Sequence, residues 1–135
     1  MSMAKIINFP IIGDDRGSLI SIEPGFNKNV PFEVKRIYYI FGTKPGVSRG
    51  FHAHKKLKQV AIAISGSCQM LLKNGIDQEI IDLNSPNLGL LIEGMTWREM
   101  HNFSADCVLM VLASEAYDES DYIRDYDVFL SQVKR

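Results

Sequence analysis

The feature that most constrains the fold is a pair of histidines, His52 and His54, in a glycine-flanked segment of the chain. Residues at positions i and i+2 of a β-strand point to the same face, so we expect both imidazoles on one side of a strand. The next apolar run, residues 59–65, alternates small side chains with bulky ones, and its small residues share the face of Gln59. A face of small residues beneath two histidines suits the interior of a ligand-holding barrel. Close packing against a neighbouring sheet explains the small residues equally well.

The remainder of the chain is a series of short strand-like runs separated by turn signals. The dipeptide Asn74-Gly75 lies between two such runs and is the strongest short hairpin signal. Many short strands at this spacing are typical of an all-β sandwich or barrel. No linker or repeat divides the chain, so we predict one domain over residues 1–135. The predicted strands are Leu19–Glu23, Lys35–Phe41, Gln59–Ser65, Gln69–Leu72, Gln78–Leu83, Leu88–Ile92, Thr96–Phe103 and Cys107–Ala113.

The end of the chain changes from strand to helical periodicity. The apolar residues that recur at the spacing of one helix face are Ile123, Tyr126, Phe129 or Leu130, and Val133. We therefore predict a single C-terminal helix, with Ser120 as its N-cap, covering an open edge or mouth of the barrel.

Composition limits the partners of this chain. It has 15 basic and 16 acidic residues and no basic block, which argues against nucleic acid or an anionic membrane as the main partner. Its apolar runs are far shorter than a membrane span and its N-terminus has no apolar signal core, so we expect a cytoplasmic protein. Cys68 and Cys107 both fall in strand-like apolar stretches, and we expect two buried, reduced thiols.

Three arginines lie close to the predicted strands and histidines. Arg16 precedes the first predicted strand, Arg49 stands three residues before His52, and Arg98 lies on a late strand. A guanidinium group binds phosphate through two parallel hydrogen bonds, so these positions suit an anionic substrate. A surface role explains each arginine equally well, and the sequence leaves both interpretations open.

The spacing around the histidines resembles the first motif of the cupin barrels. In metal-binding cupins a glutamate occupies the position of Gln59, and an amide is a much poorer metal ligand than a carboxylate. The second cupin motif, which usually supplies a third histidine ligand, corresponds here to residues 94–101. Arg98 or Glu99 takes the ligand position, although a slip of one or two residues would bring in His101, and a guanidinium cannot ligate a metal. We therefore expect no metal cofactor and assign the histidine pair to proton transfer.

Five segments carry a likeness to a known enzyme family: Asp15–Leu19, Lys35–Phe41, Arg49–Lys56, Trp97–His101 and Tyr117–Arg124. In this order they resemble the dTDP-sugar 3,4-ketoisomerases, also known as WxcM-like cupins, which feed 3-amino-sugar synthesis. The likeness extends from about Ile6 to the C-terminal helix. Some of the same pieces resemble the dTDP-4-keto-6-deoxyglucose 3,5-epimerases, which are therefore the nearest competing enzymes.

The resemblance implies a metal-free cupin without a cofactor, usually a homodimer, that acts on a dTDP-linked 4-keto-6-deoxy sugar. The implied reaction converts dTDP-4-keto-6-deoxy-D-glucose into its 3-keto isomer through an enediol, with His52 and His54 as the catalytic pair. We assign His52 as the base and His54 as the proton shuttle, although the sequence does not decide which histidine is base and which is acid. The residues predicted to bind the substrate are Arg16, Tyr39, Arg49, Gln59, Trp97, Arg98 and His101.

Two points stay open at this stage. Arg16 resembles one subgroup of the family and Arg98 the other, so the galacto or gluco configuration at C4 of the product is undecided. A sugar-nucleotide-binding protein without turnover would use the same pocket, and it would differ from the enzyme by exchanging no carbon-bound proton.

Overall fold

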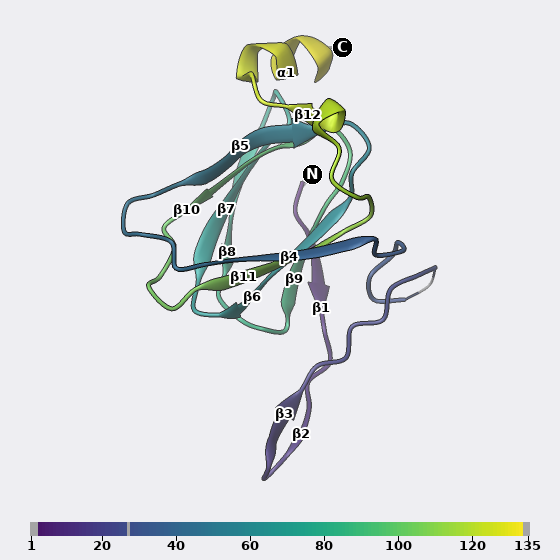
Figure 1. Cartoon of the computed structure of the whole chain (residues 1–135), viewed down its shortest axis with the longest axis vertical. Coiled ribbons are helices and arrows are strands. Elements are labelled where there is room, and N and C mark those ends of the chain that lie inside the picture. Colours follow the sequence, from purple (N-terminus) through teal and green to yellow (C-terminus); the bar gives the residue numbers. More distant parts are fainter. Residues whose placement is uncertain (1–2, 27, 134–135) are drawn as a thin grey trace.

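The computed structural model describes residues 3–26 and 28–133 and is built almost entirely from β-strands (Figure 1). A short 3-10 helix η1 (Glu119–Asp121) and one α-helix, α1 (Tyr126–Val133), lie near the C-terminus. The strands are β1 (Lys5–Asn8), β2 (Ile12–Asp14), β3 (Gly17–Leu19), β4 (Arg36–Phe41), β5 (Arg49–His54), β6 (Gln59–Ser65), β7 (Cys68–Lys73), β8 (Gln78–Leu83), β9 (Leu88–Ile92), β10 (Trp97–His101), β11 (Val108–Ala113) and β12 (Tyr122–Ile123).

Two five-stranded sheets form the body of the molecule. One has the strand order β1-β9-β6-β11-β4 and the other β12-β5-β10-β7-β8, while β2 and β3 form a separate hairpin. The paired strands in these sheets run antiparallel. Figure 1 shows the two sheets facing each other, with the β2–β3 hairpin projecting away from them. This architecture confirms the predicted all-β barrel of the cupin type.

The alternating pattern of β6 determines which side of the first sheet faces the interior. Ala61 and Ala63 pack with Leu109 in the largest apolar cluster. Val60 and Ile62 point the other way and pack against apolar side chains of the N-terminal region. The small-residue face therefore lies inside the barrel, where Ala61 and Ala63 pack against side chains of the facing sheet, as the close-packing interpretation of this run expects.

Most predicted strands are confirmed, and β6, β8 and β9 have the predicted bounds. The strand predicted over Leu19–Glu23 is wrong, because β3 already ends at Leu19. Beyond it, Ile20 and Ile22 pack against the outer apolar cluster of the first sheet instead of pairing in a ladder. Cys68 and Cys107 are buried free thiols, as predicted.

The C-terminal helix is confirmed, but its predicted start is wrong. Helix α1 begins at Tyr126, and the Asp125 carboxylate accepts hydrogen bonds from the backbone N–H groups of its first turn. The segment around Ser120 belongs to η1, whose N-cap is Asp118. Pairing of β12 with β5 then keeps the chain extended until Asp125 can start the helix. Within residues 3–26 and 28–133, no helix is long and apolar enough to cross a membrane.

Candidate active site

The two histidines stand on β5 next to an irregularity in its pairing with β10. The register shifts between Arg98 and Glu99, opposite a stretch where Gly50 and Phe51 both adopt positive φ angles of 91° and 61°. A Cβ atom on Gly50 would lie 3.0 Å from the Arg98 carbonyl oxygen, so this position requires glycine. Such β-bulges reorient the side chains that follow them and are common beside active sites.

His52 and His54 project from the same face of β5, as their spacing predicts. Their ring centroids are 4.8 Å apart. The Tyr122 ring lies against both, at 5.0 Å from the His52 ring and 4.3 Å from the His54 ring. Because Tyr122 is the register partner of His54 in the β5–β12 pair, the C-terminal segment covers the histidines directly.

Arg98 approaches the histidines from β10 as a fully buried cation, with 1% of the residue exposed. Its Nη1 donates to Gln59 Oε1 at 2.6 Å and its Nη2 donates to the Thr96 carbonyl oxygen at 2.9 Å. Gln59 Nε2 in turn donates to the Tyr38 hydroxyl at 3.0 Å. Among the described residues, no carboxylate forms an ion pair with Arg98. A buried charge without a counter-charge is costly, so an anionic group from a ligand would be favoured here.

This environment keeps both histidines neutral at physiological pH. Burial, and secondarily the Arg98 charge, lower the pKa of His52 to about 4. Burial, Arg98 and His52 together also lower the pKa of His54. Burial lowers the pKa of Arg98 to about 10, which still leaves the guanidinium charged. The site therefore combines two neutral imidazoles, which can accept protons, with a cation that can stabilise developing negative charge.

Unsatisfied polar atoms concentrate at this end of the barrel. Buried polar groups are normally hydrogen-bonded, so each exception needs an explanation. In the described part of the chain, the buried side-chain nitrogens without a hydrogen-bond partner are Arg36 Nε, His52 Nδ1, His54 Nδ1, His54 Nε2 and Arg98 Nε. His54 Nδ1 faces the Asp121 carboxylate at 3.3 Å, and for the other nitrogens a bound ligand is the natural source of the missing partners.

A pocket opens beside His52. Its volume is about 520 Å³, within the usual range for small-ligand sites. Arg36, Arg49 and Arg124 contribute positive charge to its walls, and Tyr38 and Tyr122 contribute aromatic surface. Arg124 is further held over the Tyr122 ring, with its guanidinium carbon 4.1 Å from the ring centroid.

The described residues contain no group of three or more histidine, cysteine, aspartate and glutamate side chains positioned to hold a metal ion. At the position of the expected carboxylate ligand, the amide oxygen of Gln59 accepts a hydrogen bond from Arg98. The donor set near the histidines thus does not fit the cupin metal centre.

Comparison with known proteins assigns the chain to a family. The profile of FdtA, described as WxcM-like, C-terminal, matches residues 2–134. The chain belongs to this family. It is 54% identical over 131 residues to the TDP-4-oxo-6-deoxy-alpha-D-glucose-3,4-oxoisomerase of Aneurinibacillus thermoaerophilus, covering 97% of this chain and 93% of that protein.

Solved structures of similar proteins have the same fold as this FdtA-family chain. A 3,4-ketoisomerase from Helicobacter canadensis is 53% identical, with a TM-score of 0.93 and 98% of each chain covered. A mutant of the 3,4-ketoisomerase QdtA from Thermoanaerobacterium thermosaccharolyticum, solved in complex with TDP-4-keto-6-deoxyglucose, is 44% identical. Its TM-score is 0.94, over 99% of this chain and 96% of that chain.

Several site residues predicted from the sequence of this FdtA-family chain lie together. Gln59 and Arg98 are hydrogen-bonded beneath the histidines, and Arg49 lines the same pocket as His52. Arg36 and Arg124 also line it, although neither was predicted. Arg36 and Tyr38 are two residues apart on β4 and therefore share a face, and Arg124 falls in the family-like segment Tyr117–Arg124. The sequence thus contained weak indications that both arginines lie at the site.

Two aromatic residues predicted to bind the substrate point away from the pocket. Tyr39 is 62% exposed on the outer side of β4, and its neighbour Tyr38 takes the inward position. Trp97 is buried beneath α1, where its ring packs against Tyr126 and Phe129. The substrate contacts predicted for Tyr39 and Trp97 are therefore not supported, because strand alternation turns each to the opposite face.

His101 and Arg16 are also separated from the histidine pair within this chain. His101 shares the face of Glu99 on β10, and its Nε2 and Nδ1 contact Glu99 Oε1 at 2.9 Å and Ser48 Oγ at 2.7 Å. Arg16 stands at the tip of the β2–β3 hairpin, where its guanidinium pairs with Asp14 at 2.5 Å. Neither residue is among those that line the pocket beside His52, so the substrate contacts of His101 and Arg16 stay predictions.

Proposed function

We propose that the chain is a metal-independent 3,4-ketoisomerase that converts dTDP-4-keto-6-deoxy-D-glucose into a dTDP-3-keto-6-deoxyhexose. The observation that carries this proposal is the pair of neutral histidines, His54 buried and His52 partly buried, beside the buried cation Arg98 that has no ion-pair partner among the described residues. Similar proteins with 53–54% identity over nearly the whole chain are named 3,4-oxoisomerase and 3,4-ketoisomerase, which supports it.

The proposed chemistry is a proton transfer from C3 to C4 of the sugar. The C4 carbonyl acidifies the C3–H bond, and neutral His52 removes that proton while negative charge develops on the C4 oxygen. The buried Arg98 guanidinium would stabilise the resulting enediolate. Delivery of a proton to C4, with His54 as the shuttle, and transfer of the C3 hydroxyl proton to the C4 oxygen then leave a C3 carbonyl and a C4 hydroxyl. No net oxidation occurs, so no redox cofactor is required.

The dTDP part would supply most of the ground-state affinity, because binding energy remote from the reacting carbons can position them. Arg49, Arg36 and Arg124 lie around the 520 Å³ pocket and are suited to the diphosphate. Tyr38 and Tyr122 offer aromatic surface to the base or the sugar. A nucleotide-sugar substrate is also consistent with work in the cytoplasm, which we expect for this chain.

We further propose that the chain acts as a homodimer. Ile37, Tyr39 and Phe41 expose 59%, 62% and 68% of their surface along the edge strand β4, and Ile12 and Leu19 of the hairpin are similarly exposed. Apolar edges of this kind normally pair or are covered. Exchange or pairing of the N-terminal strands would cover them and bring Arg16 toward a partner's site. Light scattering should give twice the chain mass at micromolar concentration, and the mass of one chain would exclude the dimer.

Product analysis tests the proposed activity. Purified protein is incubated with dTDP-4-keto-6-deoxy-D-glucose, and ¹H NMR follows the sugar. The proposal expects signals of a 3-keto isomer that do not arise with the His52→Asn variant. Binding of the nucleotide sugar without a new product would favour a non-catalytic binding protein, and inversion at C3 and C5 would favour a 3,5-epimerase.

A further inference from the structure

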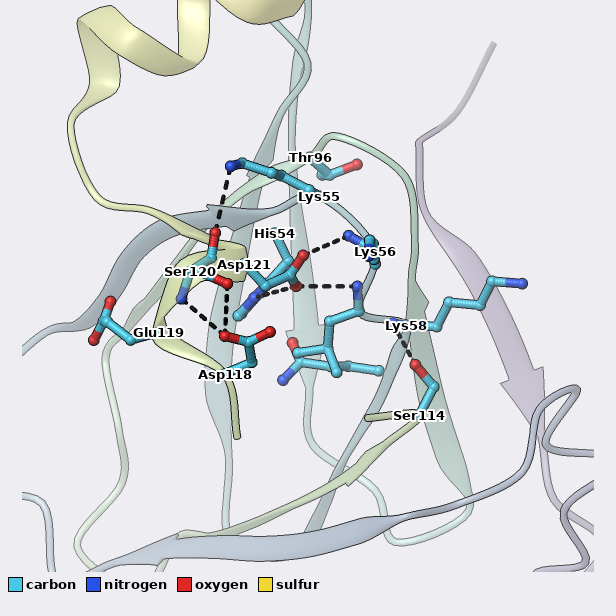
Figure 2. A network of polar contacts seen from close by, with 12 residues as sticks. His54, Lys55, Lys56, Lys58, Thr96, Ser114, Asp118, Glu119, Ser120 and Asp121 are labelled. Carbon is cyan, nitrogen blue, oxygen red and sulfur yellow. Dashed lines mark hydrogen bonds and ion pairs between the residues drawn. The ribbon is translucent and has the colours of Figure 1, made fainter. Parts of the chain in front are cut away.

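A carboxylate from the C-terminal segment, that of Asp121, stands next to His54 (Figure 2). Asp121 Oδ2 lies 3.3 Å from His54 Nδ1, and the two side chains are 12% and 1% exposed. The separation is longer and less well aligned than an ideal hydrogen bond, as contacts of reacting groups often are before substrate binds. Neither the family resemblance nor the chemistry proposed above gives Asp121 a role.

The position of this carboxylate is fixed by backbone groups of the loop that follows β5. Lys56 N–H donates to Asp121 Oδ1 at 2.8 Å, and Leu57 N–H donates to Asp121 Oδ2 at 3.2 Å. The Asp121 carbonyl oxygen accepts a further bond from Lys55 N–H at 3.1 Å. Figure 2 shows the Asp121 side chain between this loop and the His54 ring. The carboxylate is therefore anchored to the strand that carries His54.

The chemistry of the contact selects one form of the His54 ring. A carboxylate is only an acceptor, so it favours a proton on the facing atom Nδ1. A neutral imidazole carries a single ring proton, which leaves Nε2 as an acceptor. His54 Nε2 is buried and has no hydrogen-bond partner among the described residues. The free lone pair is thus available to a proton from the substrate or from His52.

We propose that Asp121 is a positioning residue that holds His54 in the Nδ1–H tautomer, so that Nε2 receives and returns the proton during turnover. The negative charge of Asp121 also stabilises the imidazolium that forms when Nε2 takes a proton, and it opposes the lowering of the His54 pKa by burial. The role of His54 in turnover rests on the proposed isomerase function. The assignment of its tautomer does not depend on that function.

The chain contains an internal reference for the test. It has three histidines in all, so ¹⁵N-histidine labelling gives three imidazole signals. His101 has the reverse arrangement, since its Nε2 faces the Glu99 carboxylate and its Nδ1 faces the Ser48 hydroxyl. We therefore expect His101 as the Nε2–H tautomer and His54 as the Nδ1–H tautomer in the same spectrum.

The experiment is long-range ¹H–¹⁵N correlation of the labelled full chain without ligand, combined with steady-state kinetics. In Asp121→Leu, we expect His54 to lose its Nδ1–H preference while the His101 signals stay unchanged. We expect kcat to fall by at least about tenfold, which is the lower end of the effect of removing a residue that orients another functional side chain. KM should change by less than about threefold.

Asp118→Ala is the matched control for a merely structural effect. Asp118 accepts a hydrogen bond from Ser120 N–H at 3.0 Å and caps η1, so its loss loosens the same segment and keeps the Asp121 carboxylate. We expect it to retain the wild-type tautomer of His54 and a kcat within about threefold of wild type, because it contacts no reacting group.

The outcomes separate the proposals from each other. A wild-type His54 protonated on Nε2 overturns the inference, even if Asp121→Leu does not fold. Equal loss of kcat and of the tautomer in Asp118→Ala also overturns it, because segment order would then be the cause. A wild-type Nδ1–H tautomer without any isomerase turnover leaves the positioning of His54 standing and refutes the proposed function instead.

Discussion

The two ends of the barrel interior differ in their buried side chains. One end is packed with apolar side chains, and the other contains buried nitrogens without hydrogen-bond partners among the described residues. At one end, which we call the apolar end, Leu83, Leu109, Cys68, Cys107 and Ala63 pack together with 0–3% exposure. At the other, the polar end, Arg36, His52, His54 and Arg98 have buried nitrogens without hydrogen-bond partners in the described part of the chain. The register of β11 relates the two ends, since it pairs Ala113 with Gln59 at the polar end and Leu109 with Ala63 toward the apolar end.

The difference shows how one fold separates stability from chemistry. Close-packed apolar side chains contribute stability without needing a ligand. Buried polar groups that lack partners cost stability, and such sites persist where function requires them. We therefore expect substitutions at the polar end to reduce turnover and substitutions at the apolar end to reduce stability.

The largest expected effect is that of His52→Asn at the polar end. A well-placed general base contributes about 100- to 10,000-fold in rate, so kcat should fall by that factor. The midpoint of urea unfolding should stay close to that of the wild type, because His52 is only partly buried and its ring Nδ1 has no hydrogen-bond partner among the described residues to lose. Loss of less than about tenfold in kcat, with folding intact, would remove His52 from the role of base.

Leu109→Ala should produce the reverse pattern at the apolar end. Leu109 is 0% exposed, and truncation of such a side chain typically costs about 2–5 kcal/mol through lost burial and the cavity left behind. Urea unfolding at a fixed protein concentration measures this loss. The folded fraction should retain the wild-type kcat, and a rate loss as large as that of His52→Asn would abolish the proposed separation.

Arg49→Ala tests the pocket rather than the reacting groups. If Arg49 makes a charge-assisted contact with the diphosphate, dTDP binding should weaken by about 1.5–3 kcal/mol. The loss should be greater at low salt than at high salt, because counterions screen exposed charges. Calorimetry measures both values. Unchanged dTDP affinity would leave the phosphate contacts to Arg36 and Arg124.

Chelation is the prediction with the smallest expected effect. The position of the cupin carboxylate ligand is occupied by Gln59, and the Arg98 cation beside it would repel a metal ion. Turnover should therefore be unchanged after exhaustive chelation and removal of the chelator. A requirement for stoichiometric zinc, iron or nickel would contradict this.

The sequence was informative wherever local alternation decided the structure. The strands β6, β8 and β9 were predicted with their observed bounds, since each is a regular run between clear turn signals. The shared face of His52 and His54 followed from a two-residue period. The C-terminal helix was predicted from its apolar spacing, although Asp125, whose carboxylate accepts hydrogen bonds from its first turn, was missed.

The sequence was least informative about faces and about distant contacts. A shift of one residue moves a side chain to the opposite side of a sheet, which is why Tyr39 was predicted in place of Tyr38 and why Trp97 was predicted together with its neighbour Arg98. Asp121 and Arg124 reach the site only because β12 pairs with β5, about seventy residues earlier in the chain. No local sequence pattern predicts such a pairing between distant segments.

Solvent exchange in heavy water tests the central claim most directly, namely that the polar end transfers a proton between neighbouring carbons of the sugar. The protein is incubated with dTDP-4-keto-6-deoxy-D-glucose in deuterium oxide, and NMR locates the label in substrate and product. The account predicts a 3-keto product, deuterium confined to C3 of the substrate or C4 of the product, and an unlabelled C5. Deuterium at C5 would identify an epimerase and contradict the account, as would bound nucleotide sugar that neither exchanges a carbon-bound proton nor isomerises.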